Sequence, residues 1–358
     1  MEDLSTLSKV IAVGVMSGTS LDGVDVILAQ FNKQDRWSYK ILASRVVPYP
    51  EPLLKKLQDV TGLSAWEYTL LEQEVSAFWA EAVQTLDSWN EASLIAVHGQ
   101  SIFHRPDLQI TRQMFNPYVM LEACKKPVVF DFRKRDLAMG GQGAPLVPVG
   151  DHLLFHPYVA CVNLGGFGNL SYPQNAHSAG FDFGVCNNLL NHLAQEMGLE
   201  YDKDGAIAAN SKEDHEVIEA LHQIPFFQKE PPKSLGYEWY EQSFFPIWDE
   251  LTKHLSVEDR LATACGHIAF ELSRWLSRLE GDVLITGGGA LNLFLMKRIR
   301  ALSGEEINIA KAEKELIEQK EALVFAFLGV LRMRNEVNVY ERVTGAYKDH
   351  SAGLIAYP

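Results

Sequence analysis

The segment Val13–Val26, VGVMSGTSLDGVDV, gathers glycines, hydroxyls and carboxylates in one turn between two apolar runs. Glycine lets a turn close on phosphate oxygens with its N–H groups pointing inward. Thr19 and Ser20 can donate hydrogen bonds, and Asp22 and Asp25 can hold water around Mg²⁺. A phosphate-bearing ligand with a metal ion therefore suits this turn. An ordinary hairpin turn, in which Ser, Asp and Gly are expected, suits it as well and is favoured by composition alone.

A second glycine-rich turn, Gly287-Gly288-Gly289, follows a predicted strand and precedes a predicted helix. Three glycines allow very close approach of a ligand such as adenosine, and a helix N-terminus favours anions. The turn lacks the G-x-G-x-x-G pattern of dinucleotide-binding proteins. A flexible strand-to-helix loop is an equally good interpretation.

Polar side chains also stand near the ends of predicted strands. Asp182, in GFDFG, suits a general base, a metal ligand or a turn former. His98, Gln100, Arg133 and Glu321 are each, taken alone, best explained as structural residues. Because ligands of α/β folds gather at the carboxyl ends of strands, their common placement favours a shared site.

The hydrophobic pattern predicts an α/β chain. Strands are expected at 10–15, 24–31, 37–47, 94–97, 127–130, 158–164, 179–183 and 282–286, the first two as a hairpin. Helices are expected within 50–86 and at 187–197, 260–279, 291–302 and 315–335. The strand–glycine turn–strand pattern recurs at 13–26 and 162–171, which favours a duplicated fold with two lobes facing a shared cleft.

Composition limits the partners of the protein. The chain has 358 residues and a formal net charge of −14, which disfavours nucleic acid and anionic membranes but not a nucleotide in a local pocket. Its four cysteines form no C-x-x-C pair, so a zinc site or disulfide scaffold is not expected and a reducing cytoplasm fits. The sequence shows neither a secretory signal nor a membrane-spanning run.

Taken together, these segments resemble the anhydro-N-acetylmuramic acid kinases, a family of the actin-like/sugar-kinase ATPase superfamily. The resemblance covers essentially the whole chain, and the longest marker is the most specific. The markers, in order, are GVMSGTSLDGVD, HGQSIFHRP, DFRKRDLAMGGQGAPLVP, NLGGFGNL, YDKDG, PKSLGYEW, ITGGGALN and VTGAY.

The resemblance implies an α/β fold of two actin-like (ribonuclease H-like) lobes around a central nucleotide cleft. Residues 1–129 with 343–358 would form the first lobe, and 130–342 the second. Asp182 matches the catalytic aspartate, and Asp22 and Asp25 would hold Mg²⁺ through water. The ATP-binding residues would be Gly18, Thr19, Ser20, Leu21, Asp22, Gly23, Val24, Asp25, Gly165, Gly166, Gly287, Gly288 and Gly289. The sugar-binding residues would be His98, Gln100, Arg133, Asn187 and Glu321.

The implied reaction opens 1,6-anhydro-N-acetylmuramic acid with water and phosphorylates its 6-oxygen from ATP with Mg²⁺. The product is N-acetylmuramic acid 6-phosphate, formed in recycling of cell-wall sugar. The resemblance also implies a cytoplasmic homodimer whose partners are the sugar and ATP, without nucleic acid or membrane.

The sequence departs from the family pattern near the predicted base. Family members usually have F-D-T-G-P-G-N, whereas this chain has FDFGVCN, with bulkier Phe183 and Val185. Asn191 and Asn116 stand where an aspartate is usual. Two alternatives therefore remain: a kinase of the same fold for another anhydro- or amino-sugar, and a nucleotide-binding module without turnover.

Overall fold

The computed structural model describes residues 7–18, 21, 23–174, 177–231 and 233–358. The chain folds into two compact units, one made of Met1–Phe155 and Gln319–Pro358 and the other of His156–Glu318. These boundaries differ from the predicted ones, since residues 130–155 and 319–342 belong to the first unit. The reason is packing: the helix that contains residues 319–333 lies against the first sheet, as described below. The predicted α/β class with a sheet in each of two lobes is confirmed.

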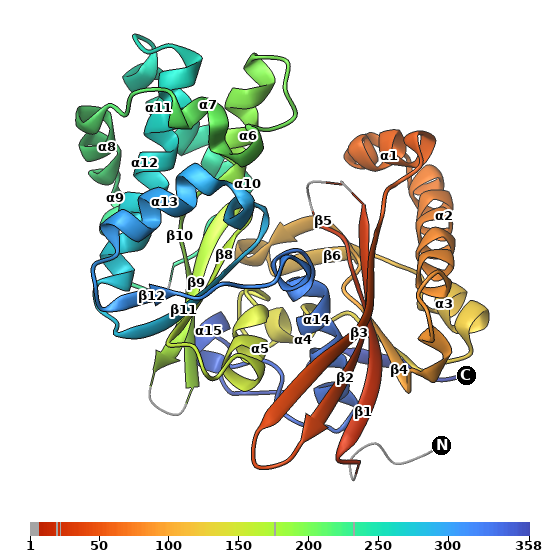
Figure 1. Ribbon diagram of the computed structural model, residues 1–358. Helices are drawn as coiled ribbons and strands as arrows, with labels where there is room; N and C mark the ends of the chain where they lie inside the picture. The colour runs from red at the N-terminus through yellow and green to blue at the C-terminus, as the bar shows by residue number, and fades with distance from the viewer. Residues whose placement is uncertain (1–6, 19–20, 22, 175–176, 232) are drawn as a thin grey trace. The chain divides into compact units, whose positions relative to one another are not determined.

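The first unit is built on a six-stranded sheet of order β13-β7-β4-β1-β2-β3 (Figure 1). The predicted hairpin is confirmed, because β1 and β2 pair antiparallel with Met16 opposite Asp25. Strands β4 and β7 continue the sheet in parallel beside β1. A separate hairpin of β5 and β6 was not expected from the sequence. The strand bounds are β1 Lys9–Met16, β2 Val24–Lys33, β3 Trp37–Val47, β4 Leu94–Val97, β5 Gln100–Arg105, β6 Ile110–Met114, β7 Val128–Phe130 and β13 Leu354–Ala356.

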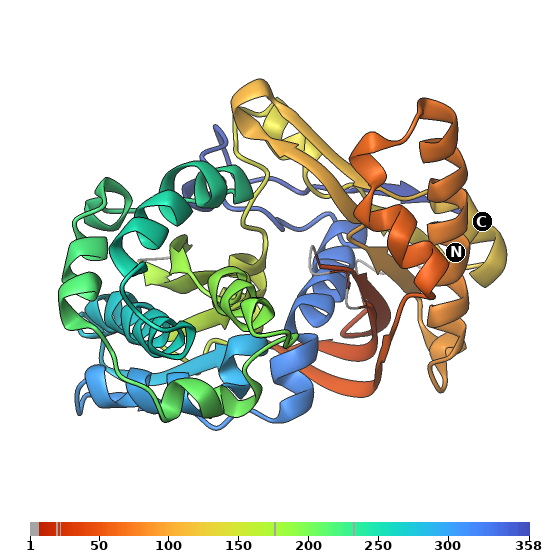
Figure 2. The same ribbon diagram turned by 90° about the horizontal axis from the view of Figure 1, so that it is seen from above.

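Helices cover both faces of this sheet because β1 is apolar on both sides. Val13 and Val15 belong to a core that includes Val75 and Trp79 of α2. Between them, Gly14 faces α14. Figure 2 shows α14, the blue helix near the centre, beside the strands of this sheet. The helix bounds are α1 Glu51–Gln58, α2 Ala65–Gln84, α3 Pro117–Cys124, α4 Lys134–Ala138, α5 Val147–Leu154, α14 Lys314–Met333 and α15 Glu341–Thr344.

The second unit has a five-stranded sheet of order β10-β9-β8-β11-β12. Its strands are β8 Ala160–Leu164, β9 Phe167–Gln174, β10 His177–Val185, β11 Gly281–Thr286 and β12 Ile307–Ile309. Its helices are α6 Asn187–Glu196, α7 Ala206–Ala209, α8 His215–His222, α9 Pro225–Gln228, α10 Tyr237–Trp239, α11 Phe245–Thr252, α12 Val257–Leu276 and α13 Leu293–Leu302. The predicted helices at 187–197, 260–279 and 291–302 match α6, α12 and α13 to within three residues at each end.

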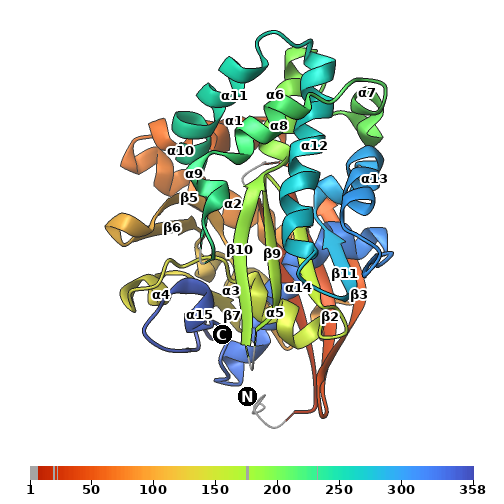
Figure 3. The ribbon, with the colours of Figure 1, turned by 90° about the vertical axis from the view of Figure 1, so that its left-hand side faces the viewer.

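Helix α12 is the central helix of this unit and runs beside β10 (Figure 3). Ser256 caps it by accepting a hydrogen bond from the Asp259 N–H, and Glu258 and Asp259 complement the helix dipole in the first turn. The core around α12 takes in Phe181, Phe183 and Val185 of β10. The strand that carries Asp182 is therefore held firmly along its apolar face.

Two further findings bear on the setting of the protein. All four cysteines are free and buried. Within the described part of the chain, no helix has the length and apolar character needed to cross a membrane.

The approach of α14 to β1 gives a stability prediction. A Cβ atom added at Gly14 would lie 2.1 Å from the Ala322 backbone oxygen, so Gly14→Ala must push the helix from the sheet. We expect it to lower the free energy of unfolding by about 1–3 kcal/mol or more. Gly62→Ala is the matched control, because a Cβ there meets nothing within 4 Å. Urea unfolding of both variants measures the difference, and equal stability of the two would contradict the packing described.

Candidate functional site

In the first unit, the turn between β1 and β2 is held by buried hydrogen bonds. Ser17 Oγ lies 2.7 Å from Gln100 Oε1 and 3.2 Å from the Gly23 carbonyl oxygen. The Gln100 amide donates to the Gly18 carbonyl oxygen at 3.3 Å. Leu21 has a positive φ of 57°, and its N–H donates to the same carbonyl oxygen at 3.4 Å. Hydrogen bonds thus hold the described residues at both ends of the turn, Ser17 and Gly18 on one side and Gly23 on the other.

Part of the predicted phosphate loop lies outside the described residues, namely Thr19, Ser20 and Asp22. Of the other members, Gly18, Leu21, Gly23, Val24 and Asp25 are described, and Val24 opens β2 with a fully buried side chain. A Cβ atom at Gly23 would lie 2.8 Å from the Val47 carbonyl oxygen, so the turn needs glycine there.

Three residues that support this turn were missed in the sequence. Tyr49 donates from its hydroxyl to Ser17 Oγ at 2.8 Å, and Trp79 Nε1 donates to Tyr49 at 3.0 Å. This chain of buried bonds ties the turn to α2. Ser17 was recognisable from its place beside Gly18, whereas nothing in the sequence singled out Tyr49 or Trp79.

Asp25 follows the turn at the start of β2. The Gln319 amide of α14 donates to its Oδ1 at 3.2 Å. The carboxylate is half-buried, and a group that holds water around a metal ion needs such partial access to solvent.

The buried His98, after β4, and the half-buried Arg133, after β7, form a hydrogen-bonded pair. Arg133 donates to His98 Nε2 from Nε at 3.0 Å and from Nη2 at 2.8 Å. Burial and the positive charge of Arg133 lower the pKa of His98 well below its ordinary value, so the imidazole is neutral and accepts at Nε2. The ring of Phe325, on α14, lies 4.6 Å from the His98 ring, centroid to centroid.

The guanidinium of Arg133 is placed by the loop after α4. Its Nη1 donates to the Gly143 carbonyl oxygen at 2.7 Å. Burial lowers the pKa of Arg133 to about 10, against the opposing effect of the negative charges of Glu321 and Asp136, so Arg133 stays charged at neutral pH. The predicted group of His98, Arg133 and Glu321 is therefore brought together in one place.

Asp136 is a further residue that the motif contained but that was not singled out. It is fully buried, accepts from the Gly143 N–H at 2.6 Å and accepts from the Thr344 hydroxyl at 2.7 Å. Its carboxylate therefore fixes the loop on which Arg133 depends. Its position within the long motif DFRKRDLAMGGQGAPLVP was the available signal.

In the second unit, the predicted glycine turns meet at the ends of β8 and β11. A Cβ atom at Gly287 would lie 2.9 Å from the Leu164 backbone, and one at Gly289 would lie 2.7 Å from Leu164 Cβ. Asn187 donates from its side chain to the Leu164 carbonyl oxygen at 2.9 Å and from its N–H to the Gly165 carbonyl oxygen at 3.0 Å.

The remaining glycines complete the same group. Gly166 accepts from the Cys186 N–H at 2.9 Å, and Gly288 lies near the Asn187 side chain. The structure thus gathers Gly165, Gly166, Asn187 and Gly287–Gly289 around the end of β8. The amide of Asn187 binds backbone here, which gives it a positioning role within the group.

Asp182 lies near the end of β10, at a bulge between Asp182 and Gly184. Its Oδ2 accepts from the Leu235 N–H at 2.7 Å, and its own N–H donates to the Lys233 carbonyl oxygen at 3.0 Å. Burial raises the pKa of Asp182 from 3.8 to about 6, although the Leu235 hydrogen bond and the charge of Lys233 oppose the rise. A carboxylate in this state is ionised at neutral pH and is a stronger base than an exposed one.

The unusual apolar residues beside Asp182 point into the core. Phe183 is fully buried and Val185 is 1% exposed. Phe183 packs on Gly168, where an added Cβ would come 2.3 Å from its ring. These two side chains therefore fill the interior of the second unit.

Comparison with known proteins shows the family of the chain. Residues 10–358 match the family described as Anhydro-N-acetylmuramic acid kinase. The chain is 34% identical to an anhydro-N-acetylmuramic acid kinase of Picosynechococcus sp., with 93% of this chain and 96% of the relative covered. It is 36% identical to one of Pseudomonas syringae pv. tomato, with 97% and 98% covered.

Among solved structures, component A of (R)-2-hydroxyglutaryl-CoA dehydratase from Acidaminococcus fermentans resembles the chain distantly, with a TM-score of 0.46 and 13% identity over 90% of this chain and 99% of that one. The sequence relatives are far more similar to the chain, at 34% and 36% identity over nearly their full length. The chain belongs to the anhydro-N-acetylmuramic acid kinase family.

Proposed function

We propose that this protein uses ATP to convert 1,6-anhydro-N-acetylmuramic acid to N-acetylmuramic acid 6-phosphate in recycling of cell-wall sugar. Membership of the family supports the proposal. The structural observation that carries it is Asp182, a carboxylate whose pKa is raised to about 6 and whose Oδ2 is fixed by the Leu235 N–H. An ionised, oriented carboxylate is what general-base attack by water requires.

In this mechanism, Asp182 takes a proton from a water molecule. The water oxygen forms a bond to the anomeric carbon, and the bond from that carbon to the bridging oxygen breaks. The released 6-oxygen accepts the γ-phosphoryl group, and ADP leaves. Only one Asp182 oxygen is held by Leu235, so the carboxylate keeps accepting capacity for the water.

The nucleotide would be bound by the two glycine turns and the β1–β2 turn. Hydrogen bonds from the Asn187 and Cys186 N–H groups hold the carbonyl groups of Gly165 and Gly166, and Gly287 and Gly289 approach Leu164 closely. Turns held in this way suit the positioning of phosphates and adenosine. Gly18 to Asp25 would provide the first phosphate loop, in which Ser17 and Gln100 hold the carbonyl groups of Gly23 and Gly18.

Asp25 and Asp22 would hold Mg²⁺ through water, and the ion would neutralise developing charge on the phosphates. The carboxylate of Asp25 is half-buried and accepts a hydrogen bond from Gln319 on one oxygen, which fits a group that contacts Mg²⁺ through water. No group of three or more His, Cys, Asp and Glu side chains able to hold a metal is found among the described residues. A Mg²⁺ ion carried by phosphates needs no such cage.

The sugar would contact the group of His98, Arg133 and Glu321. A charged guanidinium held in a fixed plane recognises a carboxylate through paired hydrogen bonds, and the substrate carries a lactyl carboxylate. The Gln100 side chain is hydrogen-bonded to Ser17 and to the Gly18 carbonyl oxygen. Its main role in sugar binding would therefore be indirect, by holding the β1–β2 turn in place.

The alternative of a different sugar rested on Phe183 and Val185. Since both side chains are buried in the core, they give no reason to expect an altered sugar pocket. The alternative of a binding module without turnover is not favoured, because Asp182 retains its hydrogen bond and raised pKa.

We also propose a cytoplasmic homodimer. The free, buried cysteines support a reducing compartment. The dimer is supported by the family resemblance and is checked by light scattering of the purified chain.

The direct test is ADP release with Mg-ATP, with and without the anhydro-sugar, together with mass spectrometry of the product. Sugar-dependent ADP release with formation of N-acetylmuramic acid 6-phosphate is the expected result. Absence of sugar-dependent turnover by folded, ATP-binding protein would refute the proposal. Turnover only with another anhydro- or amino-sugar in the same assay would mean that the protein is a kinase with a different substrate.

Asp182→Asn should lower kcat by about 10²- to 10⁴-fold while ATP binding persists, because an amide takes no proton.

The Asp182→Asn variant should also be more stable than the parent above pH 6, by about 1–3 kcal/mol, since the folded state raises the pKa of Asp182 and so disfavours its ionised form. The gain should fade as the pH falls from 6 toward 3.8, because the carboxyl is protonated in both states only below 3.8. Asp35→Asn, on an exposed turn, is the control and should change neither quantity. Parent-like turnover in Asp182→Asn would exclude Asp182 as the base.

The pH dependence of the parent enzyme gives a separate prediction. With saturating Mg-ATP, kcat/KM for the sugar should fall about tenfold per pH unit below an apparent pKa near 6, because protonated Asp182 cannot accept the proton of water. Initial rates between pH 5 and 9, with product measured directly, check this. A profile that stays flat down to pH 5 would be inconsistent with a base of raised pKa.

A further inference from the structure

The stretch Lys233–Leu235 makes two hydrogen bonds to Asp182. The Lys233 carbonyl oxygen accepts from the Asp182 N–H at 3.0 Å, and the Leu235 N–H donates to Asp182 Oδ2 at 2.7 Å. One bond fixes the backbone of β10 and the other fixes the carboxylate. The orientation of Asp182 therefore depends on where this short stretch lies.

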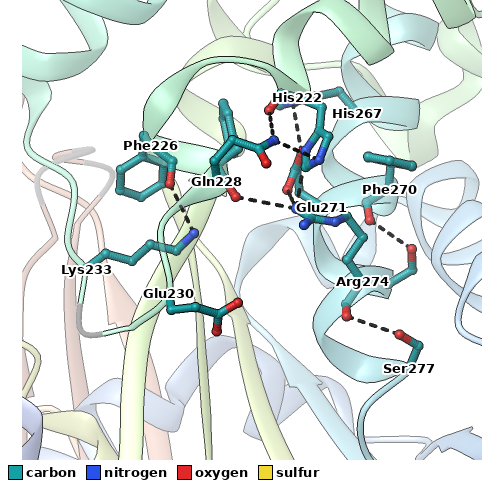
Figure 4. Close-up of polar contacts among 12 residues, drawn as sticks. His222, Phe226, Gln228, Glu230, Lys233, His267, Phe270, Glu271, Arg274 and Ser277 are labelled. Carbon is teal, nitrogen blue, oxygen red and sulfur yellow. Dashed lines mark hydrogen bonds and ion pairs between the residues drawn. The ribbon is translucent and has the colours of Figure 1, made fainter.

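The side chain of Lys233 is buried among aromatic rings, with only 9% of the residue exposed. Its ammonium nitrogen lies 4.7 Å from the ring centre of Phe226, 5.1 Å from that of Trp275 and 5.9 Å from that of Phe181. It also donates to the Phe226 carbonyl oxygen at 3.3 Å (Figure 4). These contacts join the stretch to α9 and α12 and to the residue that precedes Asp182 in β10.

The helices α12 and α9, which contact the Lys233 side chain, are themselves held by hydrogen bonds. Glu271, on α12, lies 2.7 Å from His222 Nδ1 and accepts from Arg274 at 3.0 Å. Gln228 donates to the His222 carbonyl oxygen at 2.6 Å, which ties the end of α9 to α8 (Figure 4). The anchor of Lys233 is therefore a rigid part of the second unit.

A methionine would fill the same space at lower cost, because a buried ammonium loses its hydration. The charge at this position is thus the feature to be explained. Burial lowers the pKa of Lys233 to about 8, with Arg274 and Arg278 acting in the same direction and Glu271 and Glu230 against it. Lys233 is consequently still charged at neutral pH.

This positive charge acts on Asp182. It lowers the pKa of Asp182, together with the Leu235 hydrogen bond and against burial. A further ionisable group that interacts with Asp182 is the Cys186 thiol, whose pKa is strongly raised by burial so that it stays neutral. Lys233 is therefore the charge that offsets the desolvation of the carboxylate.

We propose that Lys233 is a positioning residue for Asp182: its buried ammonium anchors the Lys233–Leu235 stretch to α9 and α12 and favours the ionised carboxylate. The inference rests on the proposed role of Asp182 as the base. It assigns Lys233 no contact with the sugar or the nucleotide.

The first test needs no turnover. The change in unfolding free energy caused by Asp182→Asn is measured from pH 4 to 9, once in the parent and once in Lys233→Met, and its dependence on pH reports the pKa of Asp182. We expect Lys233→Met to raise that pKa by roughly half a pH unit or more. Equal values in the two backgrounds would overturn the proposal. Should Lys233→Met not fold, Lys233→Gln provides a second uncharged variant.

Arg278→Met is the matched control. The Arg278 guanidinium lies 4.2 Å from the ring centre of Trp275, on the same aromatic group, but its side chain is 48% exposed and pairs with Glu230. It should leave the pKa of Asp182 unchanged. A shift as large as that in Lys233→Met would mean that any nearby charge has the effect, and would overturn a specific role for Lys233.

The second test uses activity. Lys233→Met should lower kcat and move the acid limb of the kcat/KM profile upward by the same interval, whereas Lys233→Arg should restore both. A raised KM with an unmoved acid limb would mean that Lys233 contacts a substrate, which contradicts the proposal. If the parent shows no sugar-dependent ADP release, the proposed function fails, and the unfolding measurement still decides the role of Lys233.

Discussion

The close packing of α14 against β1 and β4 is the contact on which the predicted site of the first unit depends. At Gly14 an added Cβ would lie 2.1 Å from the Ala322 oxygen, and at Gly329 it would lie 2.5 Å from Ala96 Cβ. Side chains larger than hydrogen at these two positions would separate helix and sheet. This one helix carries Gln319 to Asp25, Glu321 to the neighbourhood of Arg133, and Phe325 to the ring of His98. The distance between helix and sheet therefore sets the surroundings of Asp25 and of the His98–Arg133 pair together.

In the second unit, the main constraint is that a charged carboxylate must be stabilised in a strand with apolar surroundings. Burial makes Asp182 a stronger base and at the same time disfavours its charged form. The Leu235 N–H and the Lys233 ammonium offset part of that cost without abolishing the raised pKa. Both groups come from one stretch of chain, so the balance between basicity and ionisation is set by the placement of three residues.

Much of the fold followed from the sequence because its signals were local. Apolar β-branched runs gave the β1–β2 hairpin, β4 and β11, and helical periodicity gave α6, α12, α13 and α14. The hairpin β5–β6 was missed because buried and exposed residues alternate irregularly along its strands, with a bulge between Ser101 and Phe103. The unit boundaries were displaced for another reason: whether α14 belongs to one unit or the other is decided by the packing of Gly14, which no local pattern reveals.

The residues of the candidate site also fall into two classes, those recognisable from local sequence and those that depend on distant contacts. Glycines, Asp182 and Asp25 were recognisable by type and position, whereas Tyr49, Asp136 and Lys233 act through partners far along the chain, at separations of 32 residues for Tyr49–Ser17 and 208 for Asp136–Thr344. A buried lysine among aromatic residues resembles any other lysine when only its neighbours in sequence are known. Its role becomes visible once Phe181, Phe226 and Trp275 are placed around it.

The departures from the family pattern acquire a structural meaning once their contacts are known. Asn116 caps α3 by accepting from the Tyr118 N–H at 3.1 Å, a task that asparagine and aspartate perform about equally well. Phe183 and Val185 replace smaller residues, yet their side chains fill the core and leave the hydrogen bond from Leu235 to Asp182 in place. Gly168 leaves room for the Phe183 ring, since an added Cβ there would lie 2.3 Å from it. A loop can therefore carry two apolar side chains in place of a hydroxyl and a proline and keep its carboxylate in position, because the interior beneath it has room for both.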